Sequence, residues 1–268
     1  METAKKDVHD FWDSSSCGED LYLQDAGKAG FLRQSEARYE LEPYILTFAD
    51  FKRYKDQKVL EIGIGLGADH QEFADAGAIL YGIDLTERAI AHTSNRFKIF
   101  GCQSLLQKAD CENLPFGSDV FDLVYSWGAL HHTPDTPKAI AEVHRVLKPG
   151  GTVKAMIYHK HSLVGYMLWI RYALLAFKPL TGLDDIYANY LESPGTQAFT
   201  VADARRLFAE FKHVTINCIL THADLLTSAA GQRHESRLLR LARNIWPRWL
   251  LRMLCPQCGL FMTVKGVK

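Results

Sequence analysis

The chain has 268 residues, of which 47% are hydrophobic and 23% charged, with 31 basic and 31 acidic side chains. This balance excludes a disordered or collagen-like chain and favours a folded domain with a large core, alone or with a small cap. A net charge of zero disfavours a surface that is basic as a whole, so nucleic acid is not an expected partner.

The charge is concentrated near the end of the chain. Residues 232–268 carry eight basic side chains and one acid, so this region has a net charge of +7 and the preceding residues one of −7. A basic tail on an acidic body suggests that the tail has its own partner or its own face. The amino-terminal sequence has no apolar signal core, so we expect a cytoplasmic protein with reduced cysteines.

Short apolar runs alternate with helical stretches through the middle of the chain. The first 33 residues are expected to be irregular, and the spacing of Leu41, Ile45 and Phe48 predicts a helix over 34–49. Strands are predicted at 58–62, 79–83, 121–125 and 152–157, and helices at 68–75, 86–100 and 136–147. This alternation predicts an α/β fold with a doubly wound, mostly parallel sheet, in which ligands bind outside the carboxyl ends of the strands.

The alternation stops after Tyr158. The apolar run Leu163–Phe177 contains Arg171 and is shorter than the roughly 20 residues that span a bilayer, so it is interpreted as a lid helix. A helix and two strands return at 201–208, 214–220 and 259–264.

Three glycines follow the first predicted strand, in Glu61-Ile-Gly63-Ile64-Gly65-Leu-Gly67. Glycines there let the backbone approach a ligand, and the next helix offers free N–H groups and a positive dipole end. Asp84 follows the second strand at the spacing of a dinucleotide fingerprint, and an acid there suits a ribose diol. The alternative is a tight strand-to-helix turn without a ligand.

Two further acids separate the possible ligands. Glu61 directly precedes the glycines, where dinucleotide binders usually have an apolar residue, and an acid there suits a cationic ligand. Asp110 lies in the segment Lys108–Phe116, after a strand, and its carboxylate can accept a hydrogen bond from an exocyclic adenine amine.

Together with the segments 121–135 and 139–151, these motifs resemble the class I S-adenosylmethionine-dependent methyltransferases. The resemblance is to the branch with a methyltransferase type 11-like domain, which mostly modifies small molecules and lipids, and it covers about residues 35–160. It implies a Rossmann-like, seven-stranded sheet and S-adenosylmethionine as cofactor, with no metal. It also implies methyl transfer by in-line displacement to a small acceptor that is hydrophobic, aromatic or lipid-like.

The resemblance assigns roles to the residues at the strand ends. The glycines would border the methionine moiety, Asp84 would bind the ribose hydroxyls, and Asp110 would meet the adenine amine. Leu85 would pack on the adenine, the Cys111 backbone N–H would meet its ring, and the residues after the fourth strand would line the methyl exit. The full set of expected cofactor-binding residues is Glu61, Gly63, Ile64, Gly65, Gly67, Asp84, Leu85, Asp110, Cys111, Ser126 and Trp127.

His131 and His132 follow the fourth strand and are the candidates for a general base, because a neutral imidazole suits that role near pH 7. Family members commonly carry this pair, and its histidines take the substrate proton in some of them and are structural in many. Both readings stay open for His132, which is the better candidate of the two. Tyr158, His159 and His161 are further candidates.

Two other functions are weighed against methyl transfer. A nicotinamide-dependent oxidoreductase would need a second nucleotide-binding half, which residues 160–268 do not show. A non-catalytic cofactor-binding partner protein would be expected to have a spoiled glycine loop. Nucleic-acid acceptors are disfavoured because the Asn/Asp-Pro-Pro-aromatic motif is replaced by Ser126-Trp-Gly-Ala129 and no Pro-Cys nucleophile is present.

The predicted division is an N-terminal cap and helix (1–50), a cofactor-binding core (51–160), a helical lid insertion (161–200) and a C-terminal part (201–268) with a basic amphipathic helix. In that helix, Leu238–Leu254, apolar residues fall near one face among arginines, and Pro247 is expected to kink or end it. The lid and this helix either close over the substrate or contact an anionic membrane or lipid-like acceptor. The Cys255–Cys258 pair lacks further metal ligands at suitable spacing.

Overall fold

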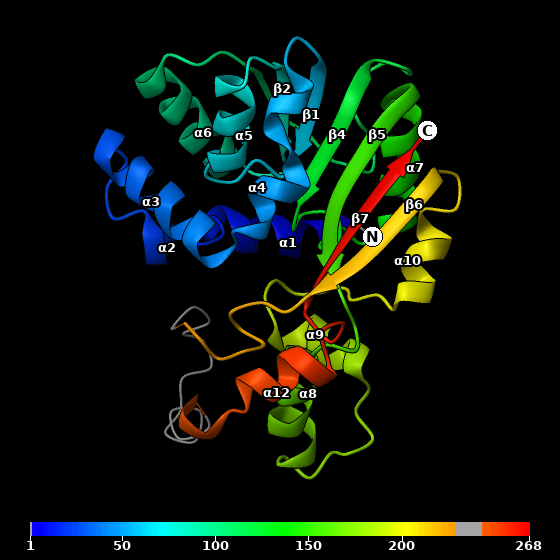
Figure 1. Cartoon of the computed structure of the whole chain (residues 1–268). Coiled ribbons are helices and arrows are strands. Elements are labelled where there is room, and N and C mark those ends of the chain that lie inside the picture. Colours follow the sequence, from blue (N-terminus) through cyan, green and yellow to red (C-terminus); the bar gives the residue numbers. More distant parts are fainter. Residues whose placement is uncertain (1, 229–242) are drawn as a thin grey trace.

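The computed structural model describes residues 2–228 and 243–268, and its centre is a seven-stranded sheet in the order β3-β2-β1-β4-β5-β7-β6 (Figure 1). The strands β1 to β5 pair in parallel, and β7 lies antiparallel between β5 and β6. The predicted α/β fold class is therefore confirmed. The strands are β1 (Lys58–Ile62), β2 (Ile79–Asp84), β3 (Leu105–Lys108), β4 (Phe121–Trp127), β5 (Leu147–Tyr158), β6 (Lys212–Ile219) and β7 (Phe261–Val267).

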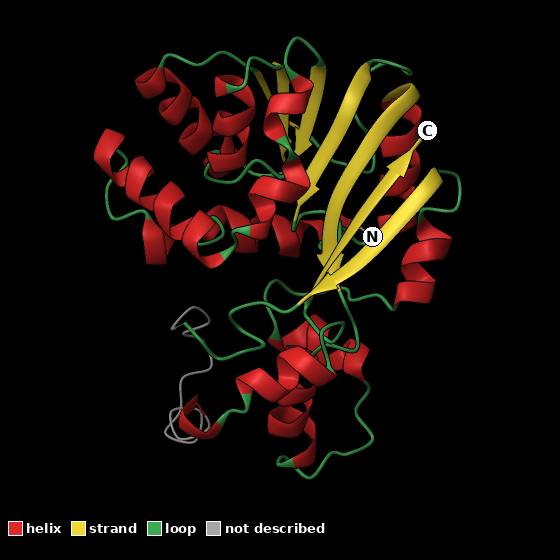
Figure 2. Cartoon of the chain, viewed as in Figure 1, coloured by secondary structure: helices red, strands yellow, loops and turns green. Residues whose placement is uncertain are grey.

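Helices cover both faces of the sheet (Figure 2), because its central strands are apolar on both sides. Val59 packs in one core cluster with α4 and α5, and the next residue, Leu60, packs in the other cluster with α7 and α10. The helices of these layers are α4 (Tyr44–Ala49), α5 (Ala68–Asp75), α6 (Glu87–Phe100), α7 (Thr136–Val146) and α10 (Val201–Leu207).

The prediction that the first 33 residues are irregular is wrong. They form α1 (Glu2–Ser14), α2 (Glu19–Tyr22) and the start of α3 (Lys28–Leu41). The helix predicted over 34–49 is divided into α3 and α4, because Pro43 lacks an N–H donor and disfavours helical geometry at the preceding residue. A 3₁₀ turn (Phe51–Tyr54) then leads into β1.

The strand predicted at 152–157 begins five residues earlier than expected, directly after α7. Helix α7 stops at Val146, and β5 begins at once and runs through Pro149 and both glycines. An irregularity in its pairing with β4, between Phe121 and Leu123, accommodates this extended start.

A smaller helical body lies below the carboxyl ends of the parallel strands (Figure 1). It contains α8 (Leu163–Trp169), a π-helical turn (Ile170–Leu174), α9 (Leu183–Tyr190) and α12 (Arg248–Leu254). The predicted lid helix over 163–177 is therefore shorter than expected. The expected break at Pro247 is confirmed, because residues 243–245 are helical, Trp246 and Pro247 are not, and α12 begins at Arg248. Leu238 and Leu241 lie outside the described residues. No helix in residues 2–228 and 243–268 is both long and apolar enough to cross a membrane.

Candidate active site

The turn after β1 is a left-handed glycine turn that opens toward a cavity. Gly63, Gly65 and Gly67 have φ values of +79°, +51° and +75°. A Cβ on Gly63 would lie 2.3 Å from the Cβ of Ala129, whereas a Cβ on Gly65 would meet nothing within 4 Å. Gly63 is thus required by close packing, and Gly65 leaves its backbone open to a ligand.

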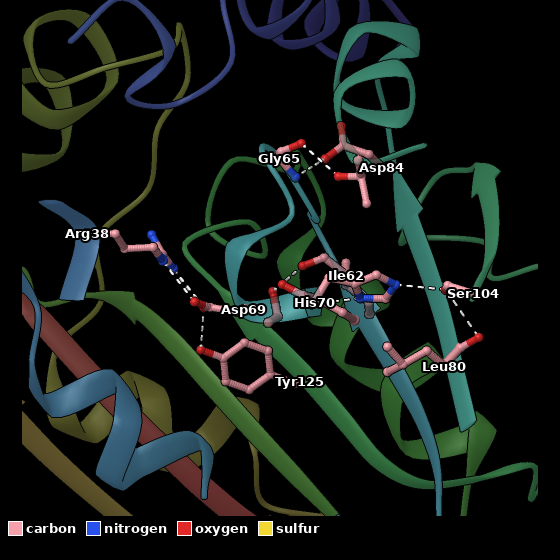
Figure 3. Close-up of polar contacts among 12 residues, drawn as sticks. Arg38, Ile62, Gly65, Asp69, His70, Leu80, Asp84, Ser104 and Tyr125 are labelled. Atoms are coloured by element: carbon pink, nitrogen blue, oxygen red, sulfur yellow. Dashed lines mark hydrogen bonds and ion pairs between the residues drawn. The ribbon is translucent and has the colours of Figure 1, made fainter. Parts of the chain in front are cut away.

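Asp84 joins the end of β2 to this turn (Figure 3). One carboxylate oxygen accepts the Gly65 N–H at 3.2 Å, and the other accepts the N–H and the hydroxyl of Thr86 at 3.0 and 2.9 Å. Burial raises the pKa of Asp84, and these hydrogen bonds oppose that effect. The carboxylate of Asp84, which is predicted to bind the ribose hydroxyls, is therefore held in a fixed orientation at the end of β2.

Glu61 faces His70 of α5 rather than standing free. The His70 Nδ1 lies 2.9 Å from a Glu61 oxygen, and its Nε2 lies 2.8 Å from the hydroxyl of Ser104, which donates to the Leu80 carbonyl (Figure 3). Nε2 therefore carries the proton donated to Ser104. Burial lowers the pKa of His70 to about 3 and raises the pKa of Glu61 well above its usual range, so burial disfavours the charged form of both groups.

A partly buried ion pair lies beside this contact, and the sequence patterns did not predict it. Arg38 of α3 donates to the carboxylate of Asp69 from Nε and Nη2, at 2.8 and 2.7 Å, and Tyr125 donates to the same carboxylate at 2.9 Å (Figure 3). Paired guanidinium and hydroxyl donors keep the pKa of Asp69 low despite burial. The pair fixes α3 against α5, and Arg38 lines the cavity.

Asp110 forms an ion pair with Lys5 of α1, a contact that was not predicted from the sequence. The Lys5 ammonium lies 2.6 Å from Asp110 and 2.5 Å from Glu112. The other oxygen of Asp110 accepts the Glu112 N–H at 2.8 Å. The carboxylate expected to recognise an adenine amine is thus already oriented toward a nitrogen donor.

These groups surround one cavity of about 750 Å³, within the range of ligand pockets. Of the expected cofactor-binding residues, those that line it are Glu61, Gly63, Ile64, Gly65, Gly67, Asp84, Leu85, Asp110, Cys111 and Trp127. Ser126 is not brought to the cavity, because its buried hydroxyl donates to the Ile62 carbonyl at 3.0 Å. His132 lines the cavity and His131 does not.

Comparison with known proteins agrees with this geometry. Residues 60–154 match a family model described as a methyltransferase domain. Residues 60–154 thus form a methyltransferase domain. The sterol 4-C-methyltransferase strm-1 of Caenorhabditis elegans is 34% identical over 101 residues, which are 37% of this chain and 30% of that protein. The chloroplastic tocopherol O-methyltransferase of Arabidopsis thaliana is 28% identical over 238 residues, which are 82% of this chain and 65% of that protein.

A solved structure supports the fold of the methyltransferase domain. The Haemonchus contortus phosphoethanolamine N-methyltransferase 2, in complex with phosphomonomethylethanolamine and S-adenosylhomocysteine, superposes with a TM-score of 0.58 at 16% identity. The alignment covers 97% of this chain and 60% of that chain. The chain thus spans less than two thirds of the length of each of these three proteins.

His132 of the methyltransferase domain is held by hydroxyl groups from the helical lid (residues 161–200). Its Nδ1 lies 2.8 Å from the Ser193 hydroxyl and 3.2 Å from that of Thr196, which in turn donates to the Ser193 carbonyl at 2.7 Å. Its Nε2 lies 3.4 Å from Glu192, which accepts from the Tyr158 hydroxyl at 2.6 Å. Glu192 and Tyr158 also line the cavity.

Of the other candidate bases, Tyr158 lines the cavity and donates its hydroxyl proton to Glu192, whereas the three histidines do not line the cavity. His131 is fully buried between the rings of Tyr158 and His132, and burial lowers its pKa. His159 faces the Gly259 carbonyl at 3.2 Å, and His161 faces the hydroxyl of Tyr166 at 3.0 Å. His131, His132 and Glu192 each place an atom that could coordinate a metal ion within 4.8 Å of the others.

The end of the cavity opposite Asp84 is largely apolar. Trp127 stacks on Tyr44 at 5.9 Å and meets the edge of Phe261 at 5.8 Å. Helix α8 adds Val164, Met167 and Leu168 to the same wall. This apolar wall, which shares the cavity with the charged side chains of Glu42, Glu192 and Arg171, suits a ligand with an apolar part.

Proposed function

We propose that the protein is an S-adenosylmethionine-dependent methyltransferase that acts on a small, apolar acceptor. The observation that carries the proposal is one cavity with two unlike ends. The glycine turn and Asp84 lie at one end, and an apolar chamber with His132 on its wall lies at the other. Relatives named for a sterol and for tocopherol support an apolar acceptor.

The residues present fit the cofactor. The backbone at Gly65 is open on the cavity side, Asp84 presents an oriented carboxylate for hydroxyl groups, and Asp110 presents one for an amine. The sulfonium group supplies an activated methyl whose leaving group is a neutral thioether. The chain's own task is to hold the acceptor in line with that methyl, and such positioning contributes roughly 7–11 kcal/mol to lowering the barrier.

The hydroxyl groups around His132 favour the tautomer that a base needs. Because the Thr196 proton is used on a carbonyl, hydrogen bonds run from His132 Nδ1–H to Ser193 and from Ser193 to Thr196. This leaves the lone pair on Nε2, beside Glu192. We propose that Nε2 takes the acceptor proton and that the Glu192 carboxylate stabilises the resulting imidazolium.

The two alternatives fit the site less well. The C-terminal half adds only the antiparallel strand β7 and the edge strand β6 to the sheet, within the residues that the structure describes, and not a second nucleotide-binding half. A non-catalytic binding protein would have no need for an oriented histidine at the far end of the cavity.

The proposal is tested by calorimetry with S-adenosylmethionine and NAD, followed by transfer of labelled methyl groups into apolar and polar extracts. We expect binding of S-adenosylmethionine, none of NAD, and label in the apolar fraction. Binding of S-adenosylmethionine without label in either fraction would favour the non-catalytic alternative.

The base is tested by His132→Asn, which preserves size but not basicity. We expect turnover to fall by about 10²–10⁴ with unchanged affinity for S-adenosylmethionine. His161→Asn is the matched control, because that imidazole faces Tyr166 away from the cavity. Unchanged turnover in the His132 variant would assign this residue a structural role.

A further inference from the structure

Large apolar side chains stand in solvent at the tip of the helical lid. Phe177 is 93% exposed and Leu180 is 98% exposed, in the segment between the π-helical turn and α9. Leu174 and Leu175, just before them, are also exposed. Exposed apolar groups of this size, close together along the chain, mark an interaction site.

A second set of exposed apolar side chains lies on α12 and on the residues directly before it. Ile245 is 81% exposed and Trp249 is 70% exposed, and Met253 and Leu254 are exposed as well. None of the side chains of α12 is buried, so this short helix does not owe its position to a buried apolar face.

Hydrogen bonds tie the beginning of α8 to the segments that flank α12, in the helical body below the sheet (Figure 1). The Trp246 indole donates to the Asp224 carbonyl at 3.0 Å, and the Val164 N–H donates to the Asp224 carboxylate at 3.2 Å. The Leu163 N–H donates to the Cys258 carbonyl at 2.9 Å. The start of α8 is therefore tied to the residues on both sides of α12.

The segments 163–182 and 243–258 contain basic side chains and no acid. Their cations are Arg171, Lys178, Arg243, Arg248 and Arg252. Arg248 donates to the backbone carbonyls of Leu225 and Leu226. The surface thus combines exposed aromatic and aliphatic groups with net positive charge, which favours the interface of an anionic bilayer.

We propose that this surface, residues 170–180 and 245–254, docks on anionic lipid membranes. A second copy of the chain is a poorer occupant, because an isologous contact would bring these cations against one another. Contacts through Phe177 and Leu180 would place apolar groups at the depth where acyl chains begin, while the cations meet lipid phosphates.

Helix α8 connects this surface to the cavity. Its Val164, Met167 and Leu168 line the cavity wall, whereas Tyr166 and Ile170 are about half exposed. An acceptor dissolved in the bilayer would therefore meet the outer side of the helix that forms the wall of the apolar chamber. This delivery role rests on the proposed function, whereas membrane docking does not.

The test is co-sedimentation of the full chain with phosphatidylcholine vesicles that contain or lack phosphatidylglycerol. We expect binding to the anionic vesicles alone, weakened by salt. Phe177→Glu with Leu180→Glu should reduce the bound fraction about ten-fold or more. Leu105→Glu is the matched control, because Leu105 is 51% exposed at the amino end of β3, away from the lid.

If the variant with Phe177→Glu and Leu180→Glu does not fold, a second double variant and a fluorescence measurement still test the proposal. Lys178→Glu with Arg252→Glu should also lower binding to anionic vesicles. Vesicles should shift the tryptophan emission of the wild type to the blue, and Trp249→Phe should reduce that shift. Absence of binding to either kind of vesicle would overturn the proposal, as would a dimer in light scattering that the glutamate variants convert to monomers.

Methyl transfer separates this proposal from the proposed function. The Phe177→Glu, Leu180→Glu variant should keep the wild-type affinity for S-adenosylmethionine and the wild-type turnover of a water-dispersed acceptor. It should lose turnover only when the acceptor is supplied in vesicles. Vesicle binding by a wild-type protein without any transferase activity would support docking and refute the proposed function.

Discussion

The two ends of the cavity differ in how far apart in sequence their contacting residues lie. At the cofactor end, Gly65 and Asp84 are 19 residues apart and belong to adjoining loops of the parallel sheet. At the acceptor end, His132 and Ser193 are 61 residues apart, and Ser193 comes from the helical lid. The first end is built from a short-range motif that many sequences share, and the second from contacts particular to this chain.

The largest expected effect breaks the cofactor end at its most closely packed glycine. Gly63→Ala would place a Cβ 2.3 Å from that of Ala129 at a φ of +79°. We expect a loss of about 3–4 kcal/mol in the free energy of unfolding, from the clash and the strained backbone together. Urea denaturation followed by circular dichroism measures it.

Gly65→Ala is the matched control for that substitution. It has the same chemistry and a φ of +51°, but the added Cβ meets nothing within 4 Å. The loss in unfolding free energy should be about 1 kcal/mol, and the main effect should be weaker binding of S-adenosylmethionine. Equal losses of stability in the two variants would contradict the packing argument.

Asp84→Asn tests the charge at the same end without removing the side chain. If the carboxylate binds the ribose hydroxyls, the dissociation constant for S-adenosylmethionine should rise about 10- to 100-fold, as expected for a hydrogen bond to a charged group. Calorimetry measures it, with Asp75→Asn at the far end of α5 as control. An unchanged dissociation constant for the Asp84 variant would refute the ribose assignment.

These two ends also explain what the sequence could predict. The bounds of β1 and α5 were predicted correctly, because their apolar runs are bounded by glycines and charged residues that act locally. Ten of the eleven expected cofactor-binding residues line the cavity for the same reason. Ser126 does not, because alternation along β4 turns it toward the Ile62 carbonyl, a choice that depends on the neighbouring strand.

The contacts that were missed all join distant segments. Lys5 reaches Asp110 across 105 residues, and Arg38 reaches Asp69 across 31. Neither lysine nor arginine stands in a motif that indicates its partner. The helical lid likewise has no periodic pattern long enough to show that residues 192–196 return to His132.

Glu42 offers a way to sharpen the comparison through pH. It lines the cavity with 3.7 Å between its carboxylate and Arg38, and burial raises its pKa to about 7. The folded state then binds more protons than the unfolded state between the ordinary pKa of 4.5 and about 7, so stability falls as pH rises through that window.

Glu42→Gln should remove this loss. At pH 8 we expect the variant to be more stable than the wild type by about 3 kcal/mol, and below pH 4.5 the difference should vanish. Chemical denaturation at a series of pH values measures both limits, and Arg38 keeps its contacts with Asp69 in the variant. A constant difference across that series would show that Glu42 does not titrate near neutral pH.

The smallest expected effect concerns the amino-terminal helices α1 and α2. The sequence did not predict these helices, although they lie beside the cofactor end of the cavity. Arg88 of α6 donates to Glu19 at 2.7 and 2.6 Å, and this lowers the pKa of Glu19 to about 2. The stabilisation is complete above the unfolded pKa of 4.5 and is lost as pH falls through about 2. Because Arg88 is partly exposed, Arg88→Met should lower the free energy of unfolding by only about 1 kcal/mol.

Hydrogen exchange of the Arg88→Met variant measures where this loss is felt. Exchange should increase in residues 2–22 and stay unchanged in β1 and β4, because those strands are buried under other helices. Faster exchange in the strands as well would mean that the amino-terminal helices and the sheet unfold as one unit.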